Sequence, residues 1–314
     1  MPTILQLVQY AGFVGAQLTN SLCLYLIYAN ACANFGRYRV MMIMLNVCSM
    51  FYSYVHLLTQ PVMHIQGAGI LFFPDSFDFV KFDNNIGICC CVMYCGSYTF
   101  CLAIFTTHFI YRYLAVCHPP MLTIFDGPKV YWPMIPALAS YVVYGGAAWY
   151  GFTPLPWKND YYREVLKNVY NHDIEKHVYL APIYFTRDTQ NHRIWFWPSI
   201  IGGLCGIAVE IVCFAVIIVC ASKTYAKLSS IAFAMSARTK TMNRQLFLML
   251  TLQTILPTVT MYIPIAVGLT FPLFEIEIGQ LANSIGCYLS IYPAMEPLIA
   301  IFVLKPFREA VLSK

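Results

Sequence analysis

The sequence predicts an all-α fold, a polytopic membrane protein built as a bundle of seven transmembrane helices. The chain has seven long apolar stretches between polar loops, and its Lys and Arg residues gather in alternate loops. Composition agrees, with 59% hydrophobic and only 11% charged residues, against about 25% charged residues in ordinary soluble domains. An α-helix of roughly 20 apolar residues crosses the hydrocarbon, where backbone amides must bond within their own segment.

The seven predicted spans account for most of the chain. They cover residues 4–29, 40–65, 87–116, 134–154, 196–221, 246–271 and 281–304. The longest remaining segment, 155–195, is expected to be a loop, and residues 305–314 a short tail. Residues 1–314 are therefore expected to form a single seven-transmembrane domain. The first stretch lacks a basic leading segment and is too long for a cleaved signal peptide.

Loop charges predict the orientation of the bundle. The loops after spans one, three and five, together with the tail, hold twelve basic residues, including Arg37 and Lys314, against only Asp126 and Glu309. The other side holds seven basic and ten acidic residues. The positive-inside rule then places the N-terminus outside and the C-terminus in the cytosol. The net charge of +5 is explained by this topology, and no nucleic-acid partner is expected.

An arginine lies near the inner end of span three. Arg112 is ~37 Å along the helix from Gly87, which places it at the inner membrane face. Tyr111-Arg112-Tyr113 resembles the Asp-Arg-Tyr motif of rhodopsin-like receptors. The structural alternative is an interfacial arginine that extends toward the headgroups.

Spans six and seven carry further motifs that strengthen this resemblance. Span seven contains Tyr292-Pro293-Ala294-Met295-Glu296-Pro297, followed by Lys305-Pro306-Phe307-Arg308, and span six runs from Gln245-Leu246-Phe247 through Gln253-Thr254 to Pro257, Tyr262 and Pro264. Together with the span-three motif, these resemble the Str family of nematode serpentine chemoreceptors over nearly the whole chain. The resemblance implies a multi-pass receptor of the plasma membrane, commonly in sensory cilia. It also implies a small, often volatile ligand, a heterotrimeric G protein as partner, and no cofactor.

The chain departs from the family pattern at two positions. Glu296 stands where relatives typically carry aspartate, and Tyr111 replaces the acid beside the arginine in rhodopsin-like receptors. Span six begins with Lys240 and Arg244 and offers Arg112 no carboxylate. We expect Arg112 to bond tyrosine hydroxyls or backbone carbonyls, or to reach headgroups and water. With Arg112, the residues Tyr111, Tyr113, Tyr292, Pro293, Glu296 and Pro297 are the candidate switch for G-protein coupling.

Two carboxylates lie inside predicted spans and are therefore functional candidates. Glu296, between Pro293 and Pro297, is interpreted as part of a hinge or as a protonated acid with one fixed hydrogen bond. Glu210 in span five is interpreted as a ligand counterion or as a helix-packing residue. Pro257 and Pro264 predict two bends on one face of span six, since seven residues are nearly two turns. An outward movement of the inner end of span six is the expected response to ligand.

A ligand pocket is expected among the outer halves of spans three, five, six and seven, where apolar surface mixes with a few hydroxyl and amide groups. Such a lining suits a small neutral odorant, although each residue also has an ordinary packing role as an alternative. The candidate ligand-binding residues are Met93, Tyr94, Ser97, Tyr98, Tyr262 and Asn283.

The thirteen cysteines are expected to be mostly buried thiols. Cys89, Cys90, Cys91 and Cys95 cluster near the outer end of span three, but residues 155–195 contain no cysteine to pair with them. His172, His177 and His192 lack a compact zinc spacing, so they are expected to be solvated and no metal site is predicted.

Residues 155–195 also show a local helical pattern. Tyr162, Val165, Leu166 and Val169 have helical spacing after a capping Asn159 or Asp160. The helix is expected to cover the outer mouth as a lid or to lie on the headgroups.

Other classes of function fit the sequence less well. An odorant-gated channel or a transporter is the alternative, but insect odorant channels have a cytosolic N-terminus and no inverted repeat is evident. Span seven has no lysine for a retinal Schiff base, and no constellation of catalytic residues suggests an enzyme. The small-residue spacing of Gly202 and Gly206 is too common to predict an oligomeric state.

Overall fold

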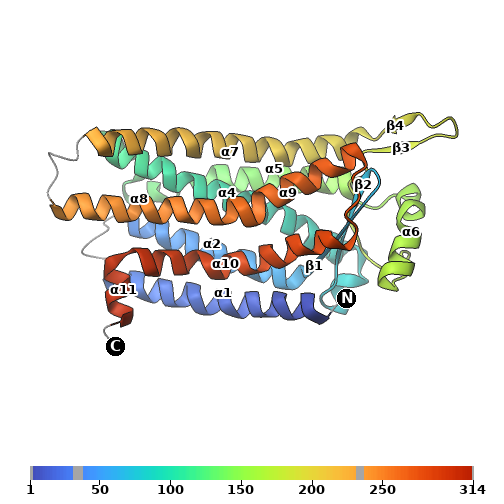
Figure 1. Cartoon of the computed structure of the whole chain (residues 1–314), viewed down its shortest axis with the longest axis horizontal. Helices are drawn as coiled ribbons and strands as arrows, with labels where there is room; N and C mark the ends of the chain where they lie inside the picture. The colour runs from blue at the N-terminus through green and yellow to red at the C-terminus, as the bar shows by residue number, and fades with distance from the viewer. Residues whose placement is uncertain (1–2, 31–37, 231–236, 313–314) are drawn as a thin grey trace.

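The computed structural model describes residues 3–30, 38–230 and 237–312. Arg37 and Lys314, which contributed to the expected basic face, lie outside the described residues. The long helices run side by side along the molecule, with α11 at one end and both β-hairpins and α6 at the other (Figure 1). The long helical segments are α1 Thr3–Asn30, α2 Tyr38–Thr59, α4 Asn84–Cys117, α5 Met134–Phe152, α7 Trp197–Ser230, α8 Ala237–Pro257 continued by η3 Thr258–Tyr262 and α9 Ile263–Thr270, and α10 Asn283–Val303.

Helix α4 lies at the centre of this bundle. It packs against α2, α5 and α7, while α1 packs against α2 and α10. Five of the described helical segments are long and apolar enough to cross a membrane: Tyr38–Thr59, Asn84–Cys117, Trp197–Ser230, Thr239–Phe274 and Gln280–Val303. The remaining two, α1 with 28 residues and α5 with 19, lie alongside them in the same bundle. A helix rises 1.5 Å per residue, so α5 is also long enough to cross the ~30 Å hydrocarbon.

The outer surface of the bundle is apolar. Along α7, the side chains of Ile201, Leu204, Ile211, Val212 and Ile218 are all more than half exposed. A contiguous apolar face of this kind is costly in water but suits lipid tails. The helical core and its apolar face together fit a membrane bundle.

The expectation that span two continues to residue 65 was wrong. Helix α2 ends at Thr59, because Pro61 has no amide hydrogen and disfavours helical backbone at the residue before it. The chain turns back as a hairpin of β1 Pro61–Gln66 and β2 Gly69–Pro74, paired from Pro61 with Pro74 to Gln66 with Gly69. At the turn Gly67 has φ of 53°, and a Cβ there would lie 2.2 Å from the Tyr161 hydroxyl. The fold therefore contains β-structure that an all-α prediction omits.

The segment expected to be a loop, 155–195, is largely structured. It contains α6 Pro156–Tyr170 and a second hairpin of β3 Phe185–Arg187 and β4 Arg193–Trp195. The predicted helix is present but begins at Pro156, whose fixed φ suits the first turn, and neither Asn159 nor Asp160 caps it. Its apolar face, including Tyr162 and Leu166, packs against β1 and β2 to form a small separate core.

Lys158 joins this outer layer to the bundle. Its ammonium nitrogen donates to the carbonyl oxygens of Gly151 at 3.0 Å, Thr153 at 3.1 Å and Ala181 at 2.8 Å. The side chain is fully buried beside the rings of Trp157 and Phe196. Burial lowers the pKa of Lys158 to about 7. Lys158 thus ties the end of α5 to the segment around Ala181.

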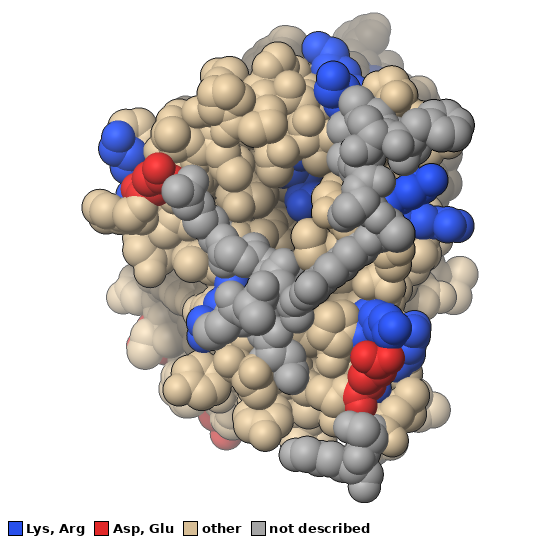
Figure 2. Space-filling view, turned by 90° about the vertical axis from the view of Figure 1, so that its left-hand side faces the viewer, with Lys and Arg blue, Asp and Glu red and all other residues tan. Residues whose placement is uncertain are grey.

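The opposite end of the bundle carries the short helices η1 Pro119–Phe125, η2 Gly127–Tyr131 and α11 Lys305–Leu312. Helix α11 is amphipathic and buries Phe307 completely. Figure 2 shows this end, where Lys and Arg side chains lie around the surface and acidic side chains are few. Other short elements of the described chain are α3 Asp78–Lys81, η4 Phe271–Phe274 and η5 Gln280–Ala282.

Candidate functional site

An apolar cavity of about 90 Å³ lies beneath the layer formed by the first hairpin and α6. An apolar cavity of ~150 Å³ on a comparable measure holds benzene, so this one has space for a molecule of a few heavy atoms. Its lining comes from α2, β1, β2, α4, α5, α9, α10 and the segment after α6: Tyr52, Met63, Ile65, Ile70, Phe72, Tyr94, Cys95, Tyr98, Tyr144, Phe152, Leu180, Pro182, Ile265, Gly268, Leu269 and Ile285.

Aromatic rings form one wall of the cavity. Tyr94 stacks against Tyr52 and Phe72, with ring centroids 5.9 Å and 5.7 Å apart. The Tyr52 hydroxyl donates to the Tyr94 hydroxyl at 3.3 Å. Aromatic pairs of this kind add ~0.5–1.5 kcal/mol beyond the area they bury, so this wall is held in place before any ligand enters.

Two of the six predicted ligand residues, Tyr94 and Tyr98, line the cavity. Met93, on the next face of α4, instead lines an apolar groove beside α2. Ser97 is buried and donates to the Tyr94 carbonyl oxygen within α4. Asn283 accepts a hydrogen bond from the Met63 amide at 2.8 Å and so anchors β1 to α10.

The sixth predicted residue, Tyr262, lies next to the cavity lining. Its ring contacts Tyr98 with centroids 5.5 Å apart and Phe214 of α7 with centroids 5.3 Å apart.

The prediction placed the pocket partly on span five, which corresponds to α7. No residue of α7 lines the cavity, whereas Tyr144 and Phe152 of α5 do. The hairpin residues and Leu180 were also missed, because nothing in the sequence pattern indicated that β1 and β2 fold back over the bundle. Helix α6 contributes no lining residue either. It packs against β1 and β2, which supply part of the cavity wall.

The two prolines of span six flank an irregular turn. Pro257 is the last residue of α8, Pro264 lies in the first turn of α9, and between them Thr258–Tyr262 form the π-helical segment η3. The expectation of two bends on one face assumed regular α-helical turns, and the wider π turn invalidates it. Short π-helical segments occur frequently at functional sites.

Glu296 is buried in the middle of α10, where two prolines interrupt the helix. Its carboxylate accepts a hydrogen bond from Tyr292, four residues earlier, at 3.4 Å. Side chains from other helices bond the surrounding backbone: Asn20 donates to the Pro293 carbonyl at 2.8 Å and Gln253 to the Glu296 carbonyl at 3.3 Å. The segment from Tyr292 to Pro297 is therefore tied to α1 and α8.

Arg112 is buried near the C-terminal end of α4, with 7% of its surface exposed. It donates to the Asn243 side-chain oxygen at 2.9 Å, and its guanidinium lies over the Tyr38 ring at 5.7 Å. We expected hydroxyl, backbone or lipid partners; the structure instead provides an amide from α8 and an aromatic face from α2. The contact links α4 to the N-terminal part of α8.

The neighbours of Arg112 in the motif have separate surroundings. Tyr111 is buried, and its ring packs between Tyr38 and Phe125. Tyr113 points to the opposite side, where its hydroxyl bonds His118 at 3.0 Å.

The loop histidines differ from the expectation of a solvated surface. His192 is exposed, but His177 is buried and its ring lies against that of His172 at a tilt of 38°, with centroids 4.4 Å apart. Burial lowers the pKa of His177 to about 4. In the described part of the chain, no three His, Cys, Asp or Glu side chains gather in a way that would hold a metal ion.

The described cysteines are all free thiols. In the span-three cluster, Cys90 and Cys91 are buried, Cys95 is half-buried and Cys89 is exposed.

Comparison with known proteins gives consistent matches over nearly the whole chain. The model of the family described as "Serpentine type 7TM GPCR chemoreceptor Str" matches residues 5–312. A Caenorhabditis briggsae protein named "Serpentine receptor class r-10" is 30% identical, over 98% of this chain and 90% of the relative. A Caenorhabditis elegans protein of the same name is 28% identical, also over 98% of this chain and 90% of the relative. "G-protein coupled receptor str-33" of Caenorhabditis elegans is 25% identical over 95% of this chain and 87% of the relative.

Proposed function

The chain belongs to the Str family of serpentine seven-transmembrane chemoreceptors, and from this membership we propose that it detects a small, volatile, neutral molecule and activates a heterotrimeric G protein. One observation carries the proposal. At one end of the bundle the apolar cavity is lined by α4 and α9, and at the opposite end Arg112 of α4 bonds Asn243 of α8. Because α8 and α9 are two parts of span six, α4 and span six contact both the proposed ligand site and the proposed coupling site.

The proposed orientation places the hairpins and α6 outside the cell and α11 in the cytosol. It rests on the positive-inside bias of the loops and on the basic surface at the α11 end (Figure 2). We further propose that residues 1–314 act as one receptor domain in the plasma membrane of a sensory cilium. Labelling of tags at the two termini in intact cells tests the orientation, which is contradicted if both tags react from the same side.

The proposed mechanism is a movement of span six. Ligand in the cavity contacts α9 through Ile265, Gly268 and Leu269, and the π-helical segment η3 separates α9 from α8. Outward movement of the inner end of α8 would break the Arg112–Asn243 bond and expose Arg112 and the basic inner loop to the G protein. A ligand drives this change only if it binds the open state more tightly than the closed one.

A functional screen tests the proposal. The receptor is expressed with a calcium reporter and a promiscuous Gα subunit, and a panel of volatile compounds is applied. Arg112→Ala is expected to abolish responses while surface expression persists. Responses that remain without any G protein, or ligand-gated current from the receptor alone, would contradict the proposal.

A further inference from the structure

Three buried polar groups lie on helical segments that pack around Tyr98, a residue of the cavity lining. They are the hydroxyls of Tyr98 and Tyr262 and one carboxylate oxygen of Glu210, and none has a partner among the described residues. All three side chains are at least nine-tenths buried, with 4%, 3% and 6% of their surface exposed. Leaving a buried donor or acceptor unpaired costs ~1–3 kcal/mol each, so this arrangement requires a partner from outside the chain.

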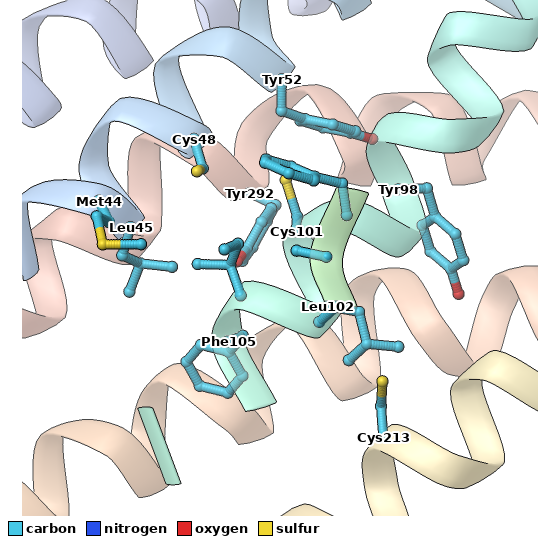
Figure 3. Packing of buried hydrophobic residues seen from close by; sticks show 14 of the residues in the cluster. Met44, Leu45, Cys48, Tyr52, Tyr98, Cys101, Leu102, Phe105, Cys213 and Tyr292 are labelled. Carbon is cyan, nitrogen blue, oxygen red and sulfur yellow. The ribbon is translucent and has the colours of Figure 1, made fainter. Parts of the chain in front are cut away.

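The three groups come together from three different helical segments. Tyr98 on α4 and Tyr262 at the end of η3 are in ring contact at 5.5 Å. Glu210 lies on α7 one turn before Phe214, and the Phe214 ring contacts the Tyr262 ring with centroids 5.3 Å apart. The Glu210 carboxyl also interacts electrostatically with Tyr262. Figure 3 shows the Tyr98 hydroxyl pointing toward α7, which carries Cys213, and away from Tyr52.

Tyr98 connects this polar group to the cavity. Tyr98 lines the cavity, and its hydroxyl is buried without a hydrogen-bond partner in the described chain. A molecule that fills the cavity therefore contacts Tyr98, and a change of the Tyr98 side-chain rotamer would let its other end reach Tyr262 and Glu210.

We propose that Tyr98, Tyr262 and Glu210 form the polar half of the ligand site and bind the hydroxyl group of a small aliphatic alcohol, whose chain fills the cavity. We choose an alcohol because its donor and acceptor atoms match those of the three side chains. An alcohol oxygen accepts from two donors, here the tyrosine hydroxyls, and its hydrogen is donated to the Glu210 oxygen. An ether or ketone lacks that hydrogen, and a hydrocarbon pairs with none of the three groups. The inference rests on the proposed function and names the ligand class for the same site.

The position of Tyr262 gives such a ligand a direct route to span six. Tyr262 is the last residue of η3, the π-helical segment that joins α8 to α9. A hydrogen bond to its hydroxyl, together with the displacement of the Tyr98 ring that packs on it, acts on the turn that sets the direction of α8.

Binding to purified receptor in lipid nanodiscs tests this inference without any G protein. The probes are 1-butanol, diethyl ether and n-pentane, which have equal numbers of heavy atoms. Wild-type receptor is expected to bind butanol more tightly than the other two. Tyr98→Phe, Tyr262→Phe and Glu210→Gln should each weaken butanol binding about fivefold and leave pentane unchanged.

Tyr162→Phe is the matched control, because the Tyr162 hydroxyl is also buried without a partner in the described chain but belongs to the separate core of α6, β1 and β2. It should leave the order of the three probes unchanged. Equal affinity of the wild type for all three probes, or equal losses for butanol and pentane in the variants, overturns the inference.

Infrared difference spectra of the wild type provide a test that does not depend on the folding of variants. Butanol is expected to shift the carboxyl bands of the receptor, and pentane to leave them in place. Absence of a butanol-specific shift also overturns the inference. Butanol binding without G-protein activation would instead contradict the proposed function and leave the assignment of the site intact.

Discussion

Replacing Asn243 by alanine removes the amide oxygen that accepts a 2.9 Å hydrogen bond from Arg112, and we expect this variant to signal without ligand. A hydrogen bond to a charged group contributes ~1.5–3 kcal/mol, and every 1.4 kcal/mol corresponds to a factor of ten. If the bond is present only when the inner end of α8 is closed, its loss shifts the equilibrium toward the open state about ten- to hundredfold.

The assay is nucleotide exchange on a heterotrimeric G protein by receptor in nanodiscs, measured without ligand and normalised to folded receptor. Asn243→Asp is the matched variant, because it keeps an acceptor oxygen and adds a negative charge opposite Arg112. Its basal exchange is expected to fall below that of the wild type. The role of this contact would be refuted if Asn243→Ala had the same basal nucleotide exchange and thermal stability as the wild type. It would also be refuted if Asn243→Ala and Asn243→Asp had equal basal exchange.

Three further predictions concern stability, measured as Tm in nanodiscs. The pKa of Lys158 is about 7 in the folded protein against ~10.4 unfolded, so wild-type stability should rise between pH 7 and 10, by at most ~1.4 kcal/mol per pH unit. The stability of Lys158→Met should not rise over this pH range. If the difference in Tm between the wild type and Lys158→Met stays constant with pH, the prediction is contradicted. Gly87→Ala places a Cβ 2.3 Å from the Val80 carbonyl oxygen and should cost ~1–3 kcal/mol, whereas Gly146→Ala, with open space around it, should be neutral or stabilising. Glu275→Gln breaks exposed ion pairs and should cost less than ~1 kcal/mol; a larger loss would show that β3 and β4 depend on these pairs.

The helical bundle was predictable because lipid imposes long apolar helices whatever the details of packing. Prediction failed where local backbone chemistry competes with hydrophobicity. Residues 61–65 are apolar enough to extend span two, yet Pro61 ends the helix and the segment becomes β1. In span six, Pro257 and Pro264 flank the π-helical segment η3, a form that the sequence pattern did not indicate.

The candidate site was only partly predictable, because each step along a helix turns the side chain by 100°. Met93 and Tyr94 lie at the same depth, yet one faces the groove beside α2 and the other the cavity. Sequence alone does not give the rotation of α4, nor the long-range pairing that brings Leu180 against Phe72. Asn243 was not among the expected partners of Arg112, which were tyrosine hydroxyls, backbone carbonyls, headgroups and water.

The distance between the inner ends of α4 and α8, with and without agonist, tests the central claim most directly. Spin-labelled unnatural amino acids at Thr123, in η1 beside α4, and at the exposed Arg244 of α8 avoid the native cysteines. In nanodiscs, an agonist found in the volatile screen is expected to lengthen this distance in the wild type. An agonist that triggers nucleotide exchange while the distance stays unchanged would contradict the account.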